Sequence, residues 1–180
     1  VCSIASPFYK CEIDDADERA EHMDILRKCC DLADALGTDI IRGFTFWRRT
    51  PMDDWWTRTL RGFDEPIEVL NERGKTVAIE NEASTMVGTG ERLQRFLAER
   101  DVDCIGAMWD PANCIFDMDE PETPYPDGYE AIRDRMPHMH LKDARLDDSG
   151  TPVCTPIGEG AIDFRAQFRA LVADGYTGYV

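Results

Sequence analysis

The sequence has no long hydrophobic run, no excess of basic residues and only three histidines. A membrane-spanning helix needs roughly 20 consecutive apolar residues, and no segment of the 180-residue chain approaches that length. Its first residues also do not form the basic-then-apolar pattern of a secretory leader. We therefore expect neither a membrane partner nor secretion.

Acidic residues outnumber basic ones by 36 to 20, which gives a formal net charge of −16. Proteins that bind nucleic acids usually display basic patches toward the phosphate backbone, whereas the basic residues here are scattered among carboxylates. The composition argues against a nucleic-acid partner. Because the carboxylates are spread along the whole chain, they would favour solubility in concentrated salt, and we expect a halophilic source.

The seven cysteines do not form a disulfide or zinc pattern. Their number is odd and no Cys-x-x-Cys pair occurs, which argues against a secreted disulfide framework and against a zinc knuckle. Such cysteines are typical of buried thiols in a reducing compartment. The expected location is the cytoplasm.

Short β-rich segments alternate with amphipathic segments along the chain. Strands are predicted at residues 1–6, 39–46, 76–81, 103–109 and 138–142, and a further strand is predicted to begin at 178. Helices are predicted at residues 15–36, 53–73, 90–100, 127–136 and 164–174. In the first helix, Met23, Leu26, Cys30 and Ala33 recur at three- and four-residue steps and so share one face. This alternation predicts an α/β fold of parallel strands joined by right-handed crossovers.

The strands are apolar nearly throughout, as expected for a barrel filled by its own side chains or for a sheet covered on both faces. A closed (β/α)8 barrel takes about 250 residues. We therefore expect residues 1–180 to form a single, partial TIM-barrel domain that lacks roughly two βα units at its start and one strand at its end. The alternative is a complete, open, doubly wound sheet, but no Gly-x-Gly-x-x-Gly motif follows the first strand.

Three chemically reactive side chains stand at the ends of consecutive predicted strands. Glu80 and Asp110 each close a strand, and His140 lies in the next one. In a parallel barrel, the carboxyl ends of all strands open onto one mouth, so these side chains can converge. One imidazole and two carboxylates suit Mn²⁺, Mg²⁺, Co²⁺ or Zn²⁺. Each residue alone could be a helix cap, an ion-paired group or a core residue, but their equivalent positions in three repeats favour a site for one divalent metal ion.

Five motifs together resemble the xylose-isomerase-like TIM barrels, the sugar phosphate isomerase and epimerase group. They are Ile79-Glu80-Asn81, Trp109-Asp110-Pro111-Ala112-Asn113, His138-Met139-His140-Leu141-Lys142-Asp143, Pro156-Ile157-Gly158-Glu159-Gly160 and Gly175-Tyr176-Thr177-Gly178. The resemblance covers essentially the whole chain, from the third barrel strand to the start of the eighth. It implies a divalent metal held by Glu80, Asp110, His140 and a second Glu that is expected just past Val180.

The resemblance also implies a metal-dependent isomerase or epimerase that acts on a sugar, a sugar phosphate or a related α-hydroxy carbonyl compound. The metal would polarise the carbonyl group and stabilise the enediolate that forms when the α-proton leaves. Glu80 would be both ligand and acid/base. An inosose or dehydroshikimate-type dehydratase begins with the same proton abstraction and stays open as an alternative, as does a barrel that binds sugar without catalysis. The three-zinc apurinic endonucleases of the superfamily are excluded, because three histidines cannot supply their metal cluster.

Three basic residues are candidates for contacts with the substrate. Lys142, which we also consider as a catalytic residue, and Arg42 lie at or near strand ends and could neutralise substrate oxygens or a phosphate group. Lys10 follows the first predicted strand and is a further substrate-binding candidate. The alternative for each is a solvated or ion-paired side chain.

Two more candidates lie close to Asp110 in sequence. Asn113 could hydrogen-bond the substrate or orient a metal ligand, and Trp109 is a pocket candidate by position. His138 is expected to point to the opposite face of its strand from His140.

The partners expected are a small carbohydrate substrate and a second copy of the same chain. A partial barrel would have two open sheet edges, and open edges invite pairing with another chain. The sequence therefore predicts a homo-oligomer.

Overall fold

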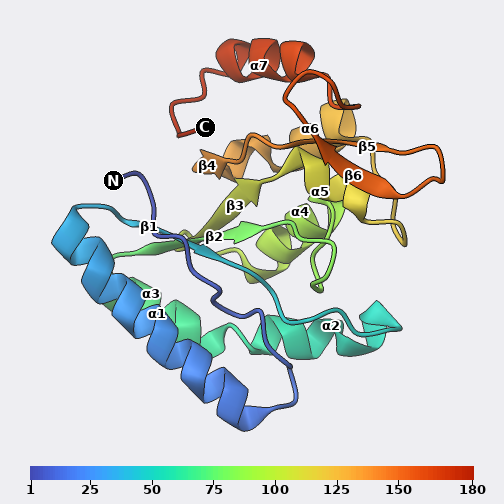
Figure 1. The fold of residues 1–180 in the computed structure, drawn as a ribbon. Helices are drawn as coiled ribbons and strands as arrows, with labels where there is room; N and C mark the ends of the chain where they lie inside the picture. Colours follow the sequence, from blue (N-terminus) through green and yellow to red (C-terminus); the bar gives the residue numbers. More distant parts are fainter.

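The computed structural model describes residues 1–180, and its centre is a four-stranded parallel sheet (Figure 1). The strands are β1 (Ile40–Gly43), β2 (Thr76–Glu80), β3 (Ile105–Trp109) and β4 (His138–Met139), and they lie side by side in the order of the sequence. Sequential parallel neighbours are the arrangement that successive βα units produce in a barrel wall. The α/β fold and the partial TIM barrel predicted from the sequence are confirmed.

Seven α-helices surround this sheet, and a short hairpin follows it (Figure 1). The helices are α1 (Ala16–Leu36), α2 (Met52–Arg61), α3 (Asp64–Arg73), α4 (Gly90–Arg100), α5 (Pro111–Phe116), α6 (Tyr129–Ile132) and α7 (Phe164–Ala173). A π-type turn (Pro124–Gly128) precedes α6, and a 3-10 turn (Arg133–Arg135) follows it. The hairpin consists of the antiparallel strands β5 (Asp143–Leu146) and β6 (Pro152–Thr155). None of the helices is both long and apolar enough to cross a lipid bilayer.

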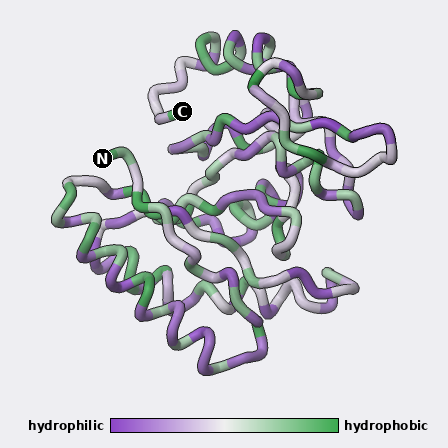
Figure 2. Tube along the Cα trace, in the orientation of Figure 1, coloured by the Kyte–Doolittle hydropathy of each residue, from purple (hydrophilic) through white to green (hydrophobic).

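The longest helix, α1, has clear sequence signals at both ends. The Asp15 side chain accepts hydrogen bonds from the backbone N–H groups of Asp17 and Glu18, and Gly37 ends the helix in the left-handed conformation with φ of 68°. The predicted apolar face, including Met23 and Leu26, is buried. Figure 2 shows the resulting alternation of hydrophilic and hydrophobic stretches along this helix.

A cluster of aromatic rings packs in the core of the molecule. It consists of Phe8, Tyr9, Phe46, Phe63 and Phe96. Phe63 meets Tyr9 and Phe96 edge to face, with ring centroids 5.1 and 4.9 Å apart. Edge-to-face contacts of this kind add to the free energy gained by burying the ring surface.

The helix predicted at 53–73 is divided into α2 and α3, and the aromatic cluster is the reason. The chain turns at Gly62 and Phe63, so that the Phe63 ring enters the cluster with no exposed surface. A β-carbon on Gly62 would lie 2.5 Å from Cε2 of Phe46, so the turn passes too close to that ring for a side chain. The sequence also carries a local signal for this break, because Pro66 in the first turn of α3 has no N–H to donate to the carbonyl oxygen of Gly62, as a continuous helix would require.

The two outer strands are shorter than predicted. Residues 1–6 contribute only a parallel bridge from Ile4 to Ile41, and the final residues only a bridge from Tyr179 to His138. The segment 138–142 is a strand over His138 and Met139 alone. In the segment predicted as a helix at 127–136, only α6 is α-helical, and turns flank it on both sides. The helical region ends at Arg135, because Pro137 disfavours the helical conformation of Met136.

Candidate metal centre

Three strand ends place Glu80, Asp110 and His140 next to one another. Glu80 is the last residue of β2, Asp110 directly follows β3, and His140 directly follows β4. The backbone N–H of His140 donates to the carbonyl oxygen of Trp109 over 2.8 Å, which keeps the chain beside β3 after the strand ends. One ligand atom from each of the three side chains lies within 4.8 Å of the other two. The convergence expected from the repeat positions is present.

Two of the three side chains are buried, and the third reaches the surface. Exposed fractions are 7% for the Glu80 side chain, 2% for Asp110 and 31% for His140. Nδ1 of His140 lies 3.3 Å from Oε1 of Glu80 and 3.8 Å from Oδ2 of Asp110. Oε2 of Glu80 is buried without a hydrogen-bond donor, and its nearest cation is Nη1 of Arg42 at 3.5 Å. An acceptor oxygen without a donor beside a second carboxylate fits a bound cation.

The electrostatics of the cluster also favour positive charge. The carboxylates of Asp110 and Glu80 raise the pKa of His140 to about 9, because they stabilise the imidazolium form. A divalent cation between the same groups would replace that proton and bind the neutral imidazole. Two carboxylate oxygens and one imidazole nitrogen are a donor set suited to the divalent ions Mg²⁺, Mn²⁺, Co²⁺ and Zn²⁺. The cluster is therefore consistent with a divalent-metal site.

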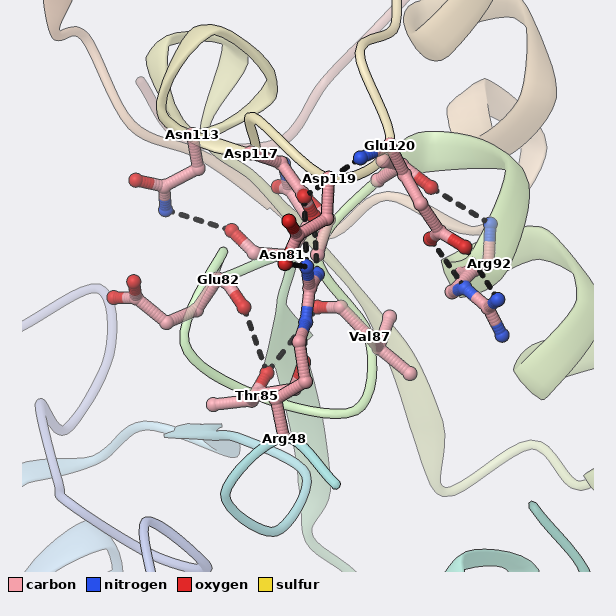
Figure 3. Close-up of polar contacts among 12 residues, drawn as sticks. Arg48, Asn81, Glu82, Thr85, Val87, Arg92, Asn113, Asp117, Asp119 and Glu120 are labelled. Atoms are coloured by element: carbon pink, nitrogen blue, oxygen red, sulfur yellow. Dashed lines mark hydrogen bonds and ion pairs between the residues drawn. The ribbon is translucent and has the colours of Figure 1, made fainter. Parts of the chain in front are cut away.

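Two asparagines, Asn81 and Asn113, cross-link the ends of β2 and β3 and contact the cluster. Figure 3 shows the contact between them. The Asn81 side chain accepts a hydrogen bond from the backbone N–H of Asp110 over 2.8 Å and donates to its carbonyl oxygen over 2.9 Å. Nδ2 of Asn113 in turn donates to the Asn81 carbonyl oxygen over 2.7 Å and contacts Oε1 of Glu80 at 3.4 Å. The carboxylates are thus held by a buried network rather than by loose loop contacts.

The two carboxylate oxygens of Asp110 have different partners. Its Oδ1 accepts hydrogen bonds from the backbone N–H groups of Ala112 and Asn113, so Asp110 caps the N-terminus of α5. Its Oδ2 faces His140. The sequence offers the helix cap and the metal ligand as alternatives for Asp110, but in the structure one oxygen caps the helix while the other faces the cluster.

The structure brings two of the predicted basic residues to the cluster and holds the third at its rim. Nζ of Lys142 donates to Oδ1 of Asn113 over 2.8 Å and lies 3.5 Å from Oδ2 of Asp110. Arg42 faces Glu80 from β1. Nζ of Lys10 instead pairs with Glu82 at 2.9 Å and stands over the Phe44 ring.

Trp109 and His138 lie elsewhere than expected. The Trp109 side chain has no exposed surface, and Gly128 packs against its ring, so the structure places it in the core rather than beside the cluster. The prediction that His138 faces away from His140 is wrong, because their ring centroids are 5.8 Å apart. Side chains alternate between the two faces of a strand, so residues two apart share a face. This rule predicts that His138 and His140 lie together, as they do in the structure.

Asn81 is the functional candidate that sequence reasoning missed. It belongs to the motif at the end of β2, and its amide is fully buried. A buried amide needs hydrogen-bond partners, so its place directly after a strand-end carboxylate is the signal that could have indicated a role. Two surface clefts, of about 790 and 880 Å³, lie against α1 and α4, and no member of the cluster lines them.

Comparison with known proteins gives similarities over the whole chain. Residues 1–180 match the family model described as xylose isomerase-like TIM barrel. An inosose dehydratase from Lacticaseibacillus casei is 23% identical over 142 residues, a match that covers 71% of this chain and 46% of that protein. The chain thus spans about half the length of the curated relatives it matches.

Solved structures show the same fold at low sequence identity. A xylose isomerase-like TIM barrel protein from Mycobacterium smegmatis, in complex with magnesium, has a TM-score of 0.77 at 19% identity, and the match covers 98% of this chain and 64% of that one. The 3-keto-D-glucoside 4-epimerase from E. coli has a TM-score of 0.74 at 21% identity, with coverage of 100% and 70%.

Proposed function

Because the chain belongs to the xylose isomerase-like TIM barrel family, we propose that it is a divalent-metal-dependent isomerase or epimerase of a sugar-like carbonyl compound. The observation that carries this proposal is the cluster of Glu80, Asp110 and His140 at three adjacent strand ends. The proposed reaction begins with removal of the proton on the carbon next to a carbonyl group.

Glu80, Asp110 and His140 would hold one divalent metal ion. The magnesium complex of a protein with the same fold supports Mg²⁺ as one candidate beside Mn²⁺, Co²⁺ and Zn²⁺. When bound, such an ion would polarise the carbonyl group and stabilise the negative charge that develops on its oxygen.

Glu80 is proposed as the acid/base as well as a ligand. Asn113 contacts its Oε1, whereas its Oε2 has no hydrogen-bond donor. A carboxylate oxygen that is buried, oriented and free of donors can accept a proton from carbon and return it to the neighbouring carbon, which completes an isomerisation without loss of atoms from the substrate. An epimerisation needs in addition a second acid on the opposite face of the substrate, which delivers a proton to the same carbon while Glu80 keeps the one that it removed.

Arg42 and Lys142 are proposed to bind substrate oxygens from two sides of the cluster. Arg42 extends from β1, and Lys142 follows β4, where Asn113 fixes its ammonium group. Lys10, paired with Glu82, would contact only a substrate large enough to reach the rim. Two cations beside a polarised carbonyl favour a substrate rich in oxygen over an apolar one.

Dehydration is a second candidate reaction, and the similarity to an inosose dehydratase favours it. The first step would be the same transfer of a proton from carbon to Glu80. A hydroxyl group on the adjacent carbon would then leave as water with a proton from an acid, and Lys142 is the ammonium donor nearest to Asp110. An enone would be the product instead of a rearranged sugar.

Proton exchange with solvent tests the proposal. The protein loaded with Mn²⁺ or Mg²⁺ is incubated in D₂O with a panel of ketoses and keto-inositols, and products are followed by NMR and by absorbance of the enone. Deuterium next to the carbonyl with no loss of water supports isomerisation or epimerisation, and enone formation supports dehydration. A metal-bound protein that exchanges no proton in any compound would contradict both and leave a non-catalytic binding protein.

Two variants make this test specific. Glu80→Gln removes the proposed base and should abolish exchange. Glu99→Gln makes the same chemical change on α4, where the carboxylate binds only Trp56 and Arg95, and should leave exchange unchanged. Equal exchange in both variants would remove Glu80 from the mechanism.

A further inference from the structure

A buried ion pair joins the loops that follow β1 and β3 (Figure 3). Arg48 lies after β1, and Asp117 lies at the C-terminal end of α5. Nη1 of Arg48 donates to Oδ1 of Asp117 over 2.8 Å, and Nη2 pairs with the second carboxylate oxygen. The Asp117 side chain has no exposed surface, and that of Arg48 is 12% exposed. The contact is therefore a bidentate pair almost entirely removed from water.

The loop after β2 closes around the same pair. Nε of Arg48 donates to the Thr85 carbonyl oxygen over 3.2 Å, and the backbone N–H of Arg48 donates to that of Ser84 over 2.9 Å. Gly88 leaves the space that the pair occupies, because a β-carbon there would lie 2.0 Å from Oδ2 of Asp117. One arginine thus connects three successive loops at the carboxyl end of the sheet.

The helix anchored by this pair carries the candidate site. α5 has only six residues, and a helix this short is not stable by its own hydrogen bonds. It begins at the Asp110 cap, contains Asn113 in its first turn, and ends where the backbone N–H of Asp117 donates to the Asn113 carbonyl oxygen over 3.0 Å. Its position must come from tertiary contacts, which are the burial of Ala112 and Cys114 in the core and the polar contacts at its two ends.

We propose that Arg48, acting through Asp117, is a positioning residue for the candidate metal centre. The pair fixes the C-terminal end of α5, and α5 in turn fixes Oδ2 of Asp110 and the amide of Asn113. A buried ion pair contributes little net stability compared with apolar packing, but it specifies geometry because each charge needs its partner in one place. Groups that orient metal ligands in this way typically change metal affinity by about 10- to 100-fold. The inference rests on the proposed function of the same site.

A second arginine, Arg92 on α4, pairs with the loop after α5 and provides the matched control. Arg92 makes a bidentate pair with Glu120, which follows Asp117 in the loop after α5. That pair ties the loop to α4. Glu120 also contacts the end of α5, where its backbone N–H donates to Oδ1 of Asp117 over 3.1 Å, but this contact does not use the side chain that pairs with Arg92. Loss of Arg92 should loosen the loop without moving Asp110, whereas loss of Arg48 should move the end of α5.

The test is a titration of the full chain with Mn²⁺, at a temperature where circular dichroism shows every variant folded. Arg48→Met and Asp117→Asn should each raise the Kd for Mn²⁺ at least tenfold, and the double variant should be no weaker than the worse single variant. Arg48→Lys should recover part of the loss, and Arg92→Met should stay within twofold of wild type. Gly88→Ala should weaken binding although both charges are still present.

Hydrogen exchange gives a readout that does not depend on the metal. Amides of residues 112–117 should exchange faster in Arg48→Met than in wild type, and at the wild-type rate in Arg92→Met. A folded Arg48→Met variant with wild-type Mn²⁺ affinity and wild-type exchange would overturn the inference, as would equal effects from Arg92→Met. If wild type binds no divalent ion, the proposed function fails, and the exchange rates alone then decide whether Arg48 anchors α5.

Discussion

Two regions in the interior of the molecule are held together by different kinds of interaction. The aromatic cluster consists of Phe8, Tyr9, Phe46, Phe63 and Phe96, and it is held by non-directional packing. The polar network at the strand ends consists of Glu80, Asn81, Asp110, Asn113 and His140, and it is held by directed hydrogen bonds. The network also leaves Oε2 of Glu80 without a donor. A region that gathers two buried carboxylates and leaves one of their oxygens unsatisfied is not arranged for stability, and this difference makes it the candidate site.

Truncation of the aromatic cluster should have the largest effect on stability and none on the site. Phe63→Ala removes a fully buried ring that contacts four other rings. It should lower the free energy of unfolding by about 3–5 kcal/mol, measured by urea denaturation. The Mn²⁺ stoichiometry of the folded variant should equal that of wild type.

A phenylalanine outside the cluster provides the control for this prediction. Phe168 on α7 is 37% exposed, so Phe168→Ala should change stability by less than about 1 kcal/mol. Equal losses from both substitutions would contradict the view that the aromatic cluster dominates the core.

Removal of Asn81 should affect both stability and the site, because its amide serves both backbone groups of Asp110. Asn81→Ala leaves the N–H and the carbonyl oxygen of Asp110 without these partners. Loss of buried partners should cost about 1–3 kcal/mol, and Mn²⁺ affinity should fall by about tenfold. Denaturation and metal titration of the same preparation measure the two effects.

Asn71, which is exposed on α3, gives a substitution of the same kind away from the site. Asn71→Ala should leave Mn²⁺ affinity unchanged. If Asn81→Ala also leaves it unchanged, the network that contacts the cluster does not hold the ligands in place.

Ion pairs outside both regions should contribute least. Nη2 of Arg27 lies 2.8 Å from Oε1 of Glu65, and both side chains are exposed. Arg27→Gln should change stability by about 0–1 kcal/mol, and the difference should shrink in 1 M salt, where the Debye length is about 3 Å. A loss as large as that of Asn81→Ala would show that charge, rather than burial and direction, sets the contribution of a polar contact.

The repeating elements and the three converging side chains could be predicted from the sequence. The helix at 90–100 has the predicted bounds, since Thr89 caps its start and its apolar residues recur on one face. Glu80, Asp110 and His140 follow from strand ends alone, because a parallel sheet brings those ends together whatever the loops do.

The parts that could not be predicted depend on long-range contacts or on signals that were overlooked. The hairpin of β5 and β6 has few apolar inward positions, so its strands carry no clear alternation. Asp110-Pro111 is a cap followed by a favoured first helical residue, which predicts a helix start at α5 that was missed. No residue near Arg48 in the sequence indicates its role. That role depends on Asp117, which is distant in sequence and comes near Arg48 only through the fold.

The most direct test is the free energy of unfolding of wild type, Phe63→Ala and His140→Ala, each measured with and without Mn²⁺. At a Mn²⁺ concentration of about 100 times Kd, binding to the native state should stabilise wild type and Phe63→Ala equally, by about 2.7 kcal/mol. His140→Ala should gain nothing, because one of its three ligands is absent. A wild-type protein that gains no stability from Mn²⁺, or a His140→Ala variant that gains as much, would contradict a metal centre at the strand ends.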